Sequence, residues 1–204
     1  NKILTLIGMV VITLASYYAY TNFIVEPNEI NAANEIYFSQ QKFEEALPAE
    51  NDSIFDIALS GNDDNIGFIE LADQFSGTKA GNLANYYIGM IYLKRNDYQN
   101  AIKYLSNFES NDIMLSSISL GSIGDSFSEL NQYEEAYEFY TKAYSISNNN
   151  YTTPIYLFKS GITALELGKF SSAFDNFTKI KYEYSDSPQA KNIDVYISKA
   201  EALK

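Results

Sequence analysis

A glycine and an alanine recur three times between residues 89 and 173, always twelve residues apart. The glycines lie 35 and then 37 residues from one another, at Gly89, Gly124 and Gly161. The alanines repeat with the same separations, at Ala101, Ala136 and Ala173. Self-similarity at a fixed period of this length is typical of repeat architectures, in which each unit buries its apolar face against the next. The sequence therefore predicts an array of similar stacked units.

Large side chains occupy fixed positions around these small residues. An aromatic residue precedes each alanine by three positions, at Tyr98, Tyr133 and Phe170. A large apolar residue follows each alanine by four positions, at Leu105, Tyr140 and Phe177. We expect the glycine to lie in the first helix of a pair, where it lets the second helix approach closely. The alanine does the same from the second helix, and the aromatic residues fill the space between successive pairs.

These residues resemble the tetratricopeptide repeat (TPR), a helix–turn–helix unit with a period of about 34 residues. The resemblance covers about residues 80–184. It implies an all-α fold built as a TPR-type α-solenoid of antiparallel helix pairs. The three repeats fall at about residues 80–110, 115–147 and 152–184, within a repeat region at 80–187.

The residues on either side of the repeats are also expected to be helical. Residues 27–79 form a degenerate N-terminal helical unit, in which one helix runs from about Asn28 to Leu47 and ends before Pro48. Two short helices follow it, at 51–60 and 65–75.

After the repeats, residues 188–204 form a C-terminal capping helix, with Ser187 as its cap. Its apolar face consists of Ala190, Ile193, Ile197 and Ala200. A solenoid needs such a helix, with a polar outer face, for solubility.

The stretch from Ile3 to Val25 contains no charged residue over 23 positions. At about 1.5 Å per residue, a helix of this length spans roughly 34 Å, enough to cross the hydrocarbon core of a bilayer. We therefore assign residues 1–26 to a single transmembrane anchor. The alternative is a cleaved signal peptide, whose apolar region usually covers about 7–15 residues.

The charges beside the anchor predict its orientation. Lys2 precedes the uncharged stretch, and Glu26 and Glu29 follow it. The positive-inside rule then places the N-terminus in the cytoplasm and residues 26–204 on the other side of the membrane.

Small and polar residues form a stripe along one face of the anchor, at Thr5, Gly8, Ile12, Ala15, Ala19 and Asn22. Small residues let a second transmembrane helix approach closely, and Thr or Asn can hydrogen-bond across the contact. The stripe therefore predicts a transmembrane helix contact. The alternative is a lone anchor that tolerates these polar residues.

Composition restricts the chemistry that is available. The 204 residues include no histidine and no cysteine, so the commonest general base and metal ligand is missing, as are thiolate sites. A net charge of −12 is unsuited to binding nucleic acid phosphates. The acidic loop residues 62–65 lack the ligand register of an EF-hand and are interpreted as a turn. We predict no catalytic residues, no metal site, no cofactor and no small-molecule substrate; the chain is not expected to be an enzyme.

The TPR resemblance also implies a partner-binding groove, because the first helix of each pair lines the concave face. Counting from the glycine of each repeat, the groove positions fall at ten residues: Tyr86, Met90, Leu93, Asp125, Ser128, Glu129, Phe158, Ile162, Leu165 and Glu166. This groove is expected to be apolar at both ends and acidic in the middle. For each residue the alternative is that it packs on a neighbouring helix.

The combination of anchor, repeats and the bridging segment at residues 68–80 resembles the YfgM-type ancillary subunits of the Sec translocon. That resemblance implies a single-pass protein of the bacterial inner membrane with a periplasmic TPR domain. Its expected partners are Sec translocon subunits and a periplasmic chaperone or prolyl isomerase, which it would hold near emerging chains as a non-catalytic scaffold. The alternatives are a TPR adaptor in another envelope secretion or cell-wall assembly complex, and a cytosol-facing targeting receptor.

Overall fold

The computed structural model describes residues 2–146 and 148–204, and the regular structure of these residues is helical apart from one short hairpin. The predicted all-α fold with a long apolar N-terminal helix and packed repeat helices is confirmed. The chain divides into two compact units, residues 1–87 and 88–204, and the division falls inside helix α5 (Lys79–Lys94).

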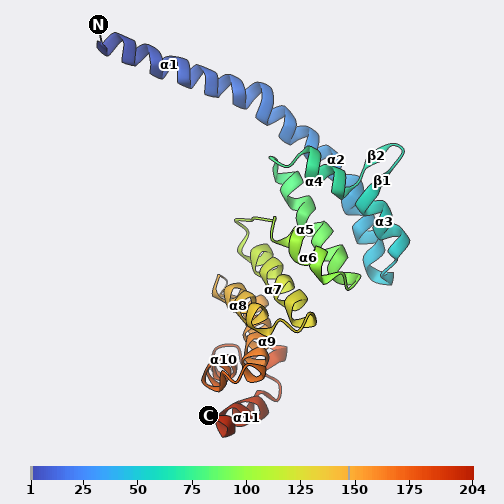
Figure 1. The fold of residues 1–204 in the computed structure, drawn as a ribbon, viewed down its shortest axis with the longest axis vertical. Helices are drawn as coiled ribbons and strands as arrows, with labels where there is room; N and C mark the ends of the chain where they lie inside the picture. Colours follow the sequence, from blue (N-terminus) through green and yellow to red (C-terminus); the bar gives the residue numbers. More distant parts are fainter. Residues whose placement is uncertain (1, 147) are drawn as a thin grey trace. The chain divides into compact units, whose positions relative to one another are not determined.

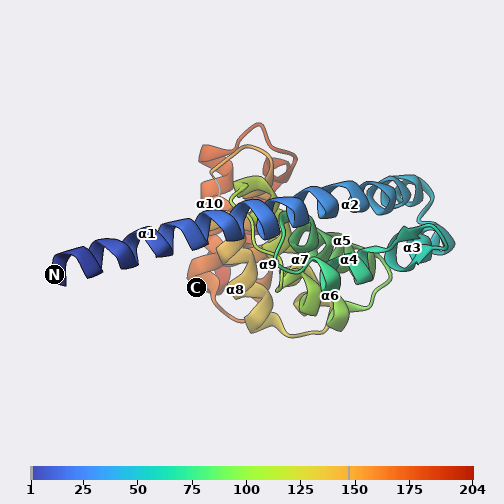
Figure 2. The ribbon, with the colours of Figure 1, turned by 90° about the horizontal axis from the view of Figure 1, so that it is seen from above.

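The first unit begins with one unbroken helical rod (Figure 1; Figure 2). Helix α1 (Lys2–Tyr20) continues through a π-helical segment (Thr21–Val25) into α2 (Glu26–Ala46). Pro27 lies in the first turn of α2 and has no N–H to donate to a carbonyl one turn earlier. A single π-helical turn accommodates such a local mismatch without ending the helix. The separate helix expected to start near Asn28 is therefore an extension of the anchor helix.

The remaining elements of the first unit pack along α2. They are α3 (Asp52–Ser60), the antiparallel strands β1 (Gly61–Asn62) and β2 (Asn65–Ile66), and α4 (Phe68–Gln74). Four aromatic rings contact one another in this unit. The Tyr87 ring stacks on Phe68 at a centroid distance of 4.8 Å and meets Phe43 edge-on at 5.0 Å. Phe43 in turn contacts Phe55 at a centroid distance of 5.9 Å. Residues 62–65 form the predicted turn, because the Asn62 side chain accepts hydrogen bonds from the backbone N–H groups of Asp64 and Asn65.

The second unit contains the C-terminal part of α5 and then helices packed in chain order (Figure 1). They are α6 (Tyr98–Leu105), α7 (Ile113–Glu129), α8 (Tyr133–Ser145), α9 (Thr152–Glu166), α10 (Phe170–Glu183) and α11 (Ile193–Leu203). A residue with a left-handed backbone joins the helices of each pair: Asn96 and Asn131 at φ 58° and Gly168 at φ 69°. This conformation reverses the chain within a few residues and favours asparagine or glycine.

We call the recurrent glycines and alanines of the three repeats the landmark residues. The landmark glycines lie where the two helices of each pair are in close contact. A Cβ added at Gly89 would approach the Leu105 side chain to 2.5 Å; at Gly124 it would approach the Tyr140 ring to 2.7 Å, and at Gly161 the Phe177 ring to 2.5 Å. In each pair the large residue is the one that follows the landmark alanine by four positions. The close approach predicted from the spacing is therefore present in all three pairs.

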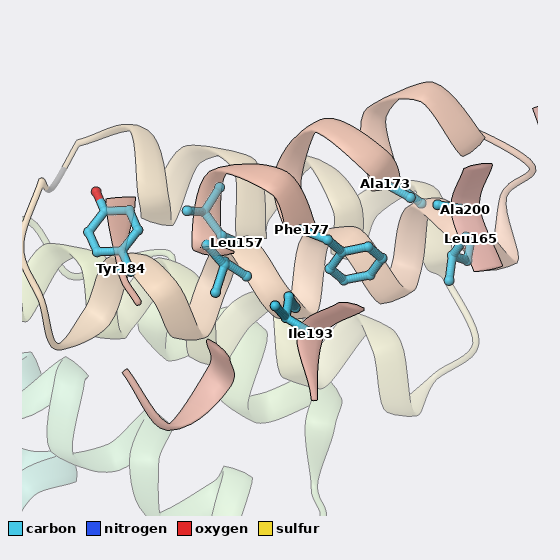
Figure 3. Close-up of a cluster of buried hydrophobic side chains, with 9 residues drawn as sticks. Leu157, Leu165, Ala173, Phe177, Tyr184, Ile193 and Ala200 are labelled. Atoms are coloured by element: carbon cyan, nitrogen blue, oxygen red, sulfur yellow. The ribbon is translucent and has the colours of Figure 1, made fainter. Parts of the chain in front are cut away.

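Helices α9, α10 and α11 enclose a core cluster that includes Leu157, Ala173, Phe177 and Ile193, all at most 3% exposed. Figure 3 shows these side chains in a row between α9, α10 and the C-terminal helix. Ile193 and Ala200 are buried in this cluster, and Ala190 and Ile197 pack against it, as the expected apolar face requires.

The capping helix differs from the expectation in one respect. Ser187 caps only a short 3-10 turn (Pro188–Ala190), by accepting a hydrogen bond from the Ala190 N–H. Asn192 then adopts a left-handed conformation at φ 63°, and α11 starts after it, at Ile193. A residue with positive φ cannot continue a right-handed helix, so residues 188–204 form a turn followed by a helix.

Candidate partner-binding groove

A pocket of about 500 Å³ lies in the second unit and is lined by residues of α5, α6, α7, α8 and α9. Six of the ten predicted groove residues line it: Leu93, Asp125, Ser128, Glu129, Phe158 and Ile162. Five further residues line it that the groove positions did not include: Asn96, Tyr98, Tyr140, Lys159 and Thr163. The first helices of three successive pairs therefore contribute to one pocket.

The centre of the pocket holds an ion pair. The Lys159 ammonium donates to both carboxylate oxygens of Asp125, at 2.6 and 2.7 Å, from α9 to α7. The Tyr140 hydroxyl donates to the same carboxylate at 2.7 Å. Both side chains of the ion pair are about one third exposed, so the pair is only partly shielded from water. Lys159 thus compensates the negative charge that the sequence placed at Asp125.

The same contacts shift the ionisation of Tyr140. Burial raises the pKa of the Tyr140 hydroxyl well above its ordinary value, and the negative charge of Asp125 and the hydrogen bond to it raise the pKa further. A tyrosine with a raised pKa keeps its proton through the neutral range and remains a donor. The Tyr140 hydroxyl therefore stays protonated and donates to the Asp125 carboxylate, which also binds Lys159.

Glu129, the last residue of α7, is the other acidic residue of the pocket and is exposed. Its contact is a long hydrogen bond of 3.4 Å from the Tyr98 hydroxyl, which also donates to Asn96 at 3.0 Å. Within residues 2–146 and 148–204, no lysine or arginine forms an ion pair with Glu129. The acidic character predicted for the middle of the groove is thus concentrated at Glu129.

Apolar side chains surround these charges. Leu93 contributes from α5, and Phe158 and Ile162 contribute from α9. Phe158 also contacts the core, with its ring 5.9 Å from Phe177 and 5.0 Å from Tyr196 between centroids. Leu93 lies outside that core cluster, whereas Ile162, like Phe158, is partly buried and packs against it.

Four of the predicted groove residues do not line the pocket. Tyr86 belongs to the first unit, where its ring meets Tyr87 edge-on at 5.6 Å. Met90 packs on the neighbouring helix, and its sulfur accepts a hydrogen bond from Ser122 at 3.5 Å. Glu166 is exposed at the end of α9.

Leu165 is only 9% exposed because it lies in the core cluster. Helix α11 contributes Ala200 to the same cluster and packs Tyr196 against it, so the capping helix covers the place where a partner would meet Leu165. Figure 3 shows Leu165 beside Ala200. The groove position is therefore occupied by the chain's own last helix.

Of the five lining residues that the groove positions omitted, only Tyr98 and Tyr140 had another signal in the sequence. Tyr98 and Tyr140 occupy recurrent repeat positions that were assigned to packing, and both also present a hydroxyl to the pocket. Asn96 is the left-handed residue of its turn. Lys159 directly follows a groove position, and no local pattern connects it to Asp125, which lies 34 residues earlier.

The stripe on the anchor helix lies open in the structure. Its residues are exposed or partly exposed: Thr5, Gly8, Ile12, Ala15, Ala19 and Asn22. A Cβ added at Gly8 would meet nothing within 4 Å. The Asn22 amide donates to the Tyr18 carbonyl of its own helix at 2.8 Å. The contact with another transmembrane helix stays a prediction.

Two segments of the chain match models of a known family. Residues 83–111 and 119–150 each match a family model described as tetratricopeptide repeat. These two matches support a TPR protein. No significant match to a curated protein is found. Repeats of this kind bind other proteins, and TPR proteins are generally non-catalytic adaptors.

The anchor assignment has support from length and composition. The described helix over Thr5–Ala49 is long and apolar enough to cross a membrane, and none of its most apolar stretch is buried inside the structure. Among the residues that the structure describes, no three acidic side chains gather in a way that would hold a metal ion.

Proposed function

We propose that this protein is a membrane-anchored, non-catalytic scaffold that binds a partner protein through the groove of its second unit. One observation carries the proposal: the first helices of three successive repeat pairs line a single pocket that combines partly exposed apolar side chains with charged ones. A pocket of about 500 Å³ has room for a few side chains of a partner. Large, partly exposed apolar residues surrounded by polar groups are the usual anchoring points of protein interfaces.

The anchor strengthens such binding. Two proteins held in the same membrane meet at a raised effective concentration, so a weak groove contact is sufficient for association. We propose that residues 1–26 span the inner membrane of a bacterium, with the N-terminus in the cytoplasm and the helical units in the periplasm. The support is Lys2 before the uncharged stretch and the acidic residues after it.

The finer assignment rests on resemblance. An anchor followed by TPR units resembles the ancillary subunits of the Sec translocon, and we propose this role, in which the groove recruits a periplasmic chaperone or prolyl isomerase to emerging chains. An adaptor in another secretion or cell-wall assembly complex uses the same anchor and groove. A cytosol-facing targeting receptor requires the opposite orientation, so topology separates it from the other two.

Photo-crosslinking in intact membranes tests the groove. A benzophenone amino acid replaces Ser128, which lines the pocket, or Ser171, which is exposed in the first turn of α10 and does not line it. We expect a specific crosslinked product from position 128 and none of the same mass from position 171. Mass spectrometry of that product identifies the partner.

The identity of the crosslinked protein decides the finer role. A Sec subunit or a periplasmic folding factor supports the translocon assignment, and a component of another envelope complex supports the alternative. Equal crosslinking from both positions contradicts the groove as the binding surface.

A further inference from the structure

The charges that line the pocket are unequal. Asp125 and Glu129 are acidic and Lys159 is basic, and Lys159 is already bound to both oxygens of Asp125. The charges of Asp125 and Lys159 compensate each other, which leaves the Glu129 carboxylate as the uncompensated charge of the pocket. Leu93 and Ile162 supply apolar surface in the same pocket.

We infer that the groove accepts a peptide segment in which a lysine or arginine stands next to a bulky apolar residue. This inference rests on the proposed function, since it names the chemistry of the partner in that same groove. The basic side chain pairs with Glu129, and the apolar neighbour contacts Leu93 and Ile162. Arginine suits the site well, because its planar guanidinium pairs with a carboxylate through two hydrogen bonds.

The same geometry disfavours an acidic ligand. An ammonium group has three N–H donors, and Asp125 takes two of those of Lys159. A carboxylate that approaches Lys159 meets the negative charges of Asp125 and Glu129. The pocket is therefore unsuited to holding a C-terminal carboxylate, and its preference should be for cationic segments.

The helix end that carries Glu129 allows a clean test. Glu129 is the last residue of α7, and Glu166 is the last residue of α9, five positions after the glycine of its own repeat. Both are exposed, and only Glu129 of these two lines the pocket. Because a lysine at a helix C-terminus is favourable, Glu129→Lys and Glu166→Lys should both fold. Both variants change the net charge by the same amount, so a general attraction of cations to the acidic chain affects them equally.

The probe is a phage-displayed random dodecapeptide library, selected on the full-length protein in mild detergent. We expect the enriched peptides to carry lysine or arginine beside leucine, isoleucine or phenylalanine. Glu129→Lys should weaken binding of the best synthetic peptide roughly three- to tenfold, because an exposed attraction is replaced by a repulsion. Glu166→Lys should leave its affinity within about twofold.

A second measurement uses salt. Raising the ionic strength should weaken the basic peptide's binding to the wild-type protein more than its binding to Glu129→Lys, because the paired charges are exposed and screened. Equal salt dependence in the two proteins contradicts the pairing with Glu129.

The remaining outcomes separate this inference from the proposed function. If the enriched peptides are neutral or acidic and Ile162→Ser weakens their binding, the cationic preference is overturned and the groove remains the binding surface. If the library gives the same peptides on the wild-type protein and on the Leu93→Ser, Ile162→Ser double variant, both the cationic preference and the groove as the binding surface are overturned. Equal loss of affinity in Glu129→Lys and Glu166→Lys shows attraction to the whole acidic chain and also overturns the inference.

Discussion

Tyr140 connects the repeat packing to the groove at the scale of a single residue. Its ring fills the space beside Gly124, where a Cβ would come within 2.7 Å, and its hydroxyl donates to Asp125 at 2.7 Å. The residue is 3% exposed. A position that the repeat pattern assigns to packing therefore also fixes the carboxylate of the central ion pair.

This contact predicts a loss of stability at alkaline pH. Because burial and Asp125 raise the pKa of Tyr140 above 10.0, the folded state holds the proton more tightly than the unfolded state does. The resulting stabilisation is complete below the unfolded pKa and declines as pH rises above about 10. Thermal unfolding of the detergent-solubilised protein should show Tyr140→Phe losing less stability than wild type between about pH 9 and 11. Tyr182→Phe, which removes an exposed hydroxyl, is the control and should follow the wild-type curve.

Packing at the landmark alanine gives a second prediction. Ala136 is fully buried beside Tyr140 and Tyr156. Ala136→Leu should lower the free energy of unfolding by about 1–3 kcal/mol, because the added carbons have no free volume. Ala202→Leu, at an exposed position of α11, should change it little. An unchanged midpoint for Ala136→Leu in urea unfolding would contradict the close contact between the paired helices.

The sequence predicted these packing residues because their recurrence at one period is itself the signal. The residues of the groove were predicted less completely, and Lys159 shows why. A repeat pattern describes what the units share, whereas Lys159 and Asp125 form a pair that occurs in one place only. Leu165 shows the opposite case, since its position matches the pattern but α11 covers it.

At the scale of elements, the turns inside the helix pairs share one backbone conformation. Asn96, Asn131 and Gly168 all have positive φ, and each stands between the two helices of a pair. The hydroxyl of the following aromatic residue donates to the asparagine at 3.0 Å in the first two pairs, from Tyr98 and Tyr133. The turn and the start of the second helix are thus tied together.

Substitutions at Asn131 test the backbone requirement. Asn131→Ala should lower the free energy of unfolding by about 1 kcal/mol, because alanine tolerates the left-handed region less well than asparagine, whose short polar side chain can hydrogen-bond locally. Asn131→Gly removes the same side-chain hydrogen bond but tolerates the left-handed region, so it should be more stable than Asn131→Ala. If differential scanning calorimetry finds alanine as stable as glycine, the turn does not require this conformation.

Element boundaries were predicted well where a single residue type ends a helix and less well elsewhere. The helix before Pro48 ends at Ala46, as the proline requires, with a 3-10 turn over Leu47–Ala49. Pro27 also lacks a backbone N–H, but the π-helical turn before it accommodates the missing hydrogen bond, so the anchor helix continues. The two-residue strands β1 and β2 are too short to produce an alternating pattern in the sequence.

For the whole molecule, orientation in the membrane is the property that separates the proposed roles. The support is one lysine before the anchor and acidic residues after it. In sealed inside-out vesicles, added protease should leave residues 26–204 intact, because they lie in the lumen. Digestion of the helical units in those vesicles would reverse the assignment and favour the cytosol-facing receptor. Detergent permeabilisation before protease treatment is the control, and it should expose the units in either orientation.

The unbroken helix from α1 through α2 makes the anchor and the first unit a single lever. No loop absorbs a rotation between them, so turning the anchor about its axis turns the buried face of α2, with Ala32, Ile36 and Phe43, by the same angle. One residue inserted before the π-helical segment changes this phase by about 100°. If residues 1–26 span a bilayer as proposed, a tilt of that span therefore tilts α2 and the side chains packed on it.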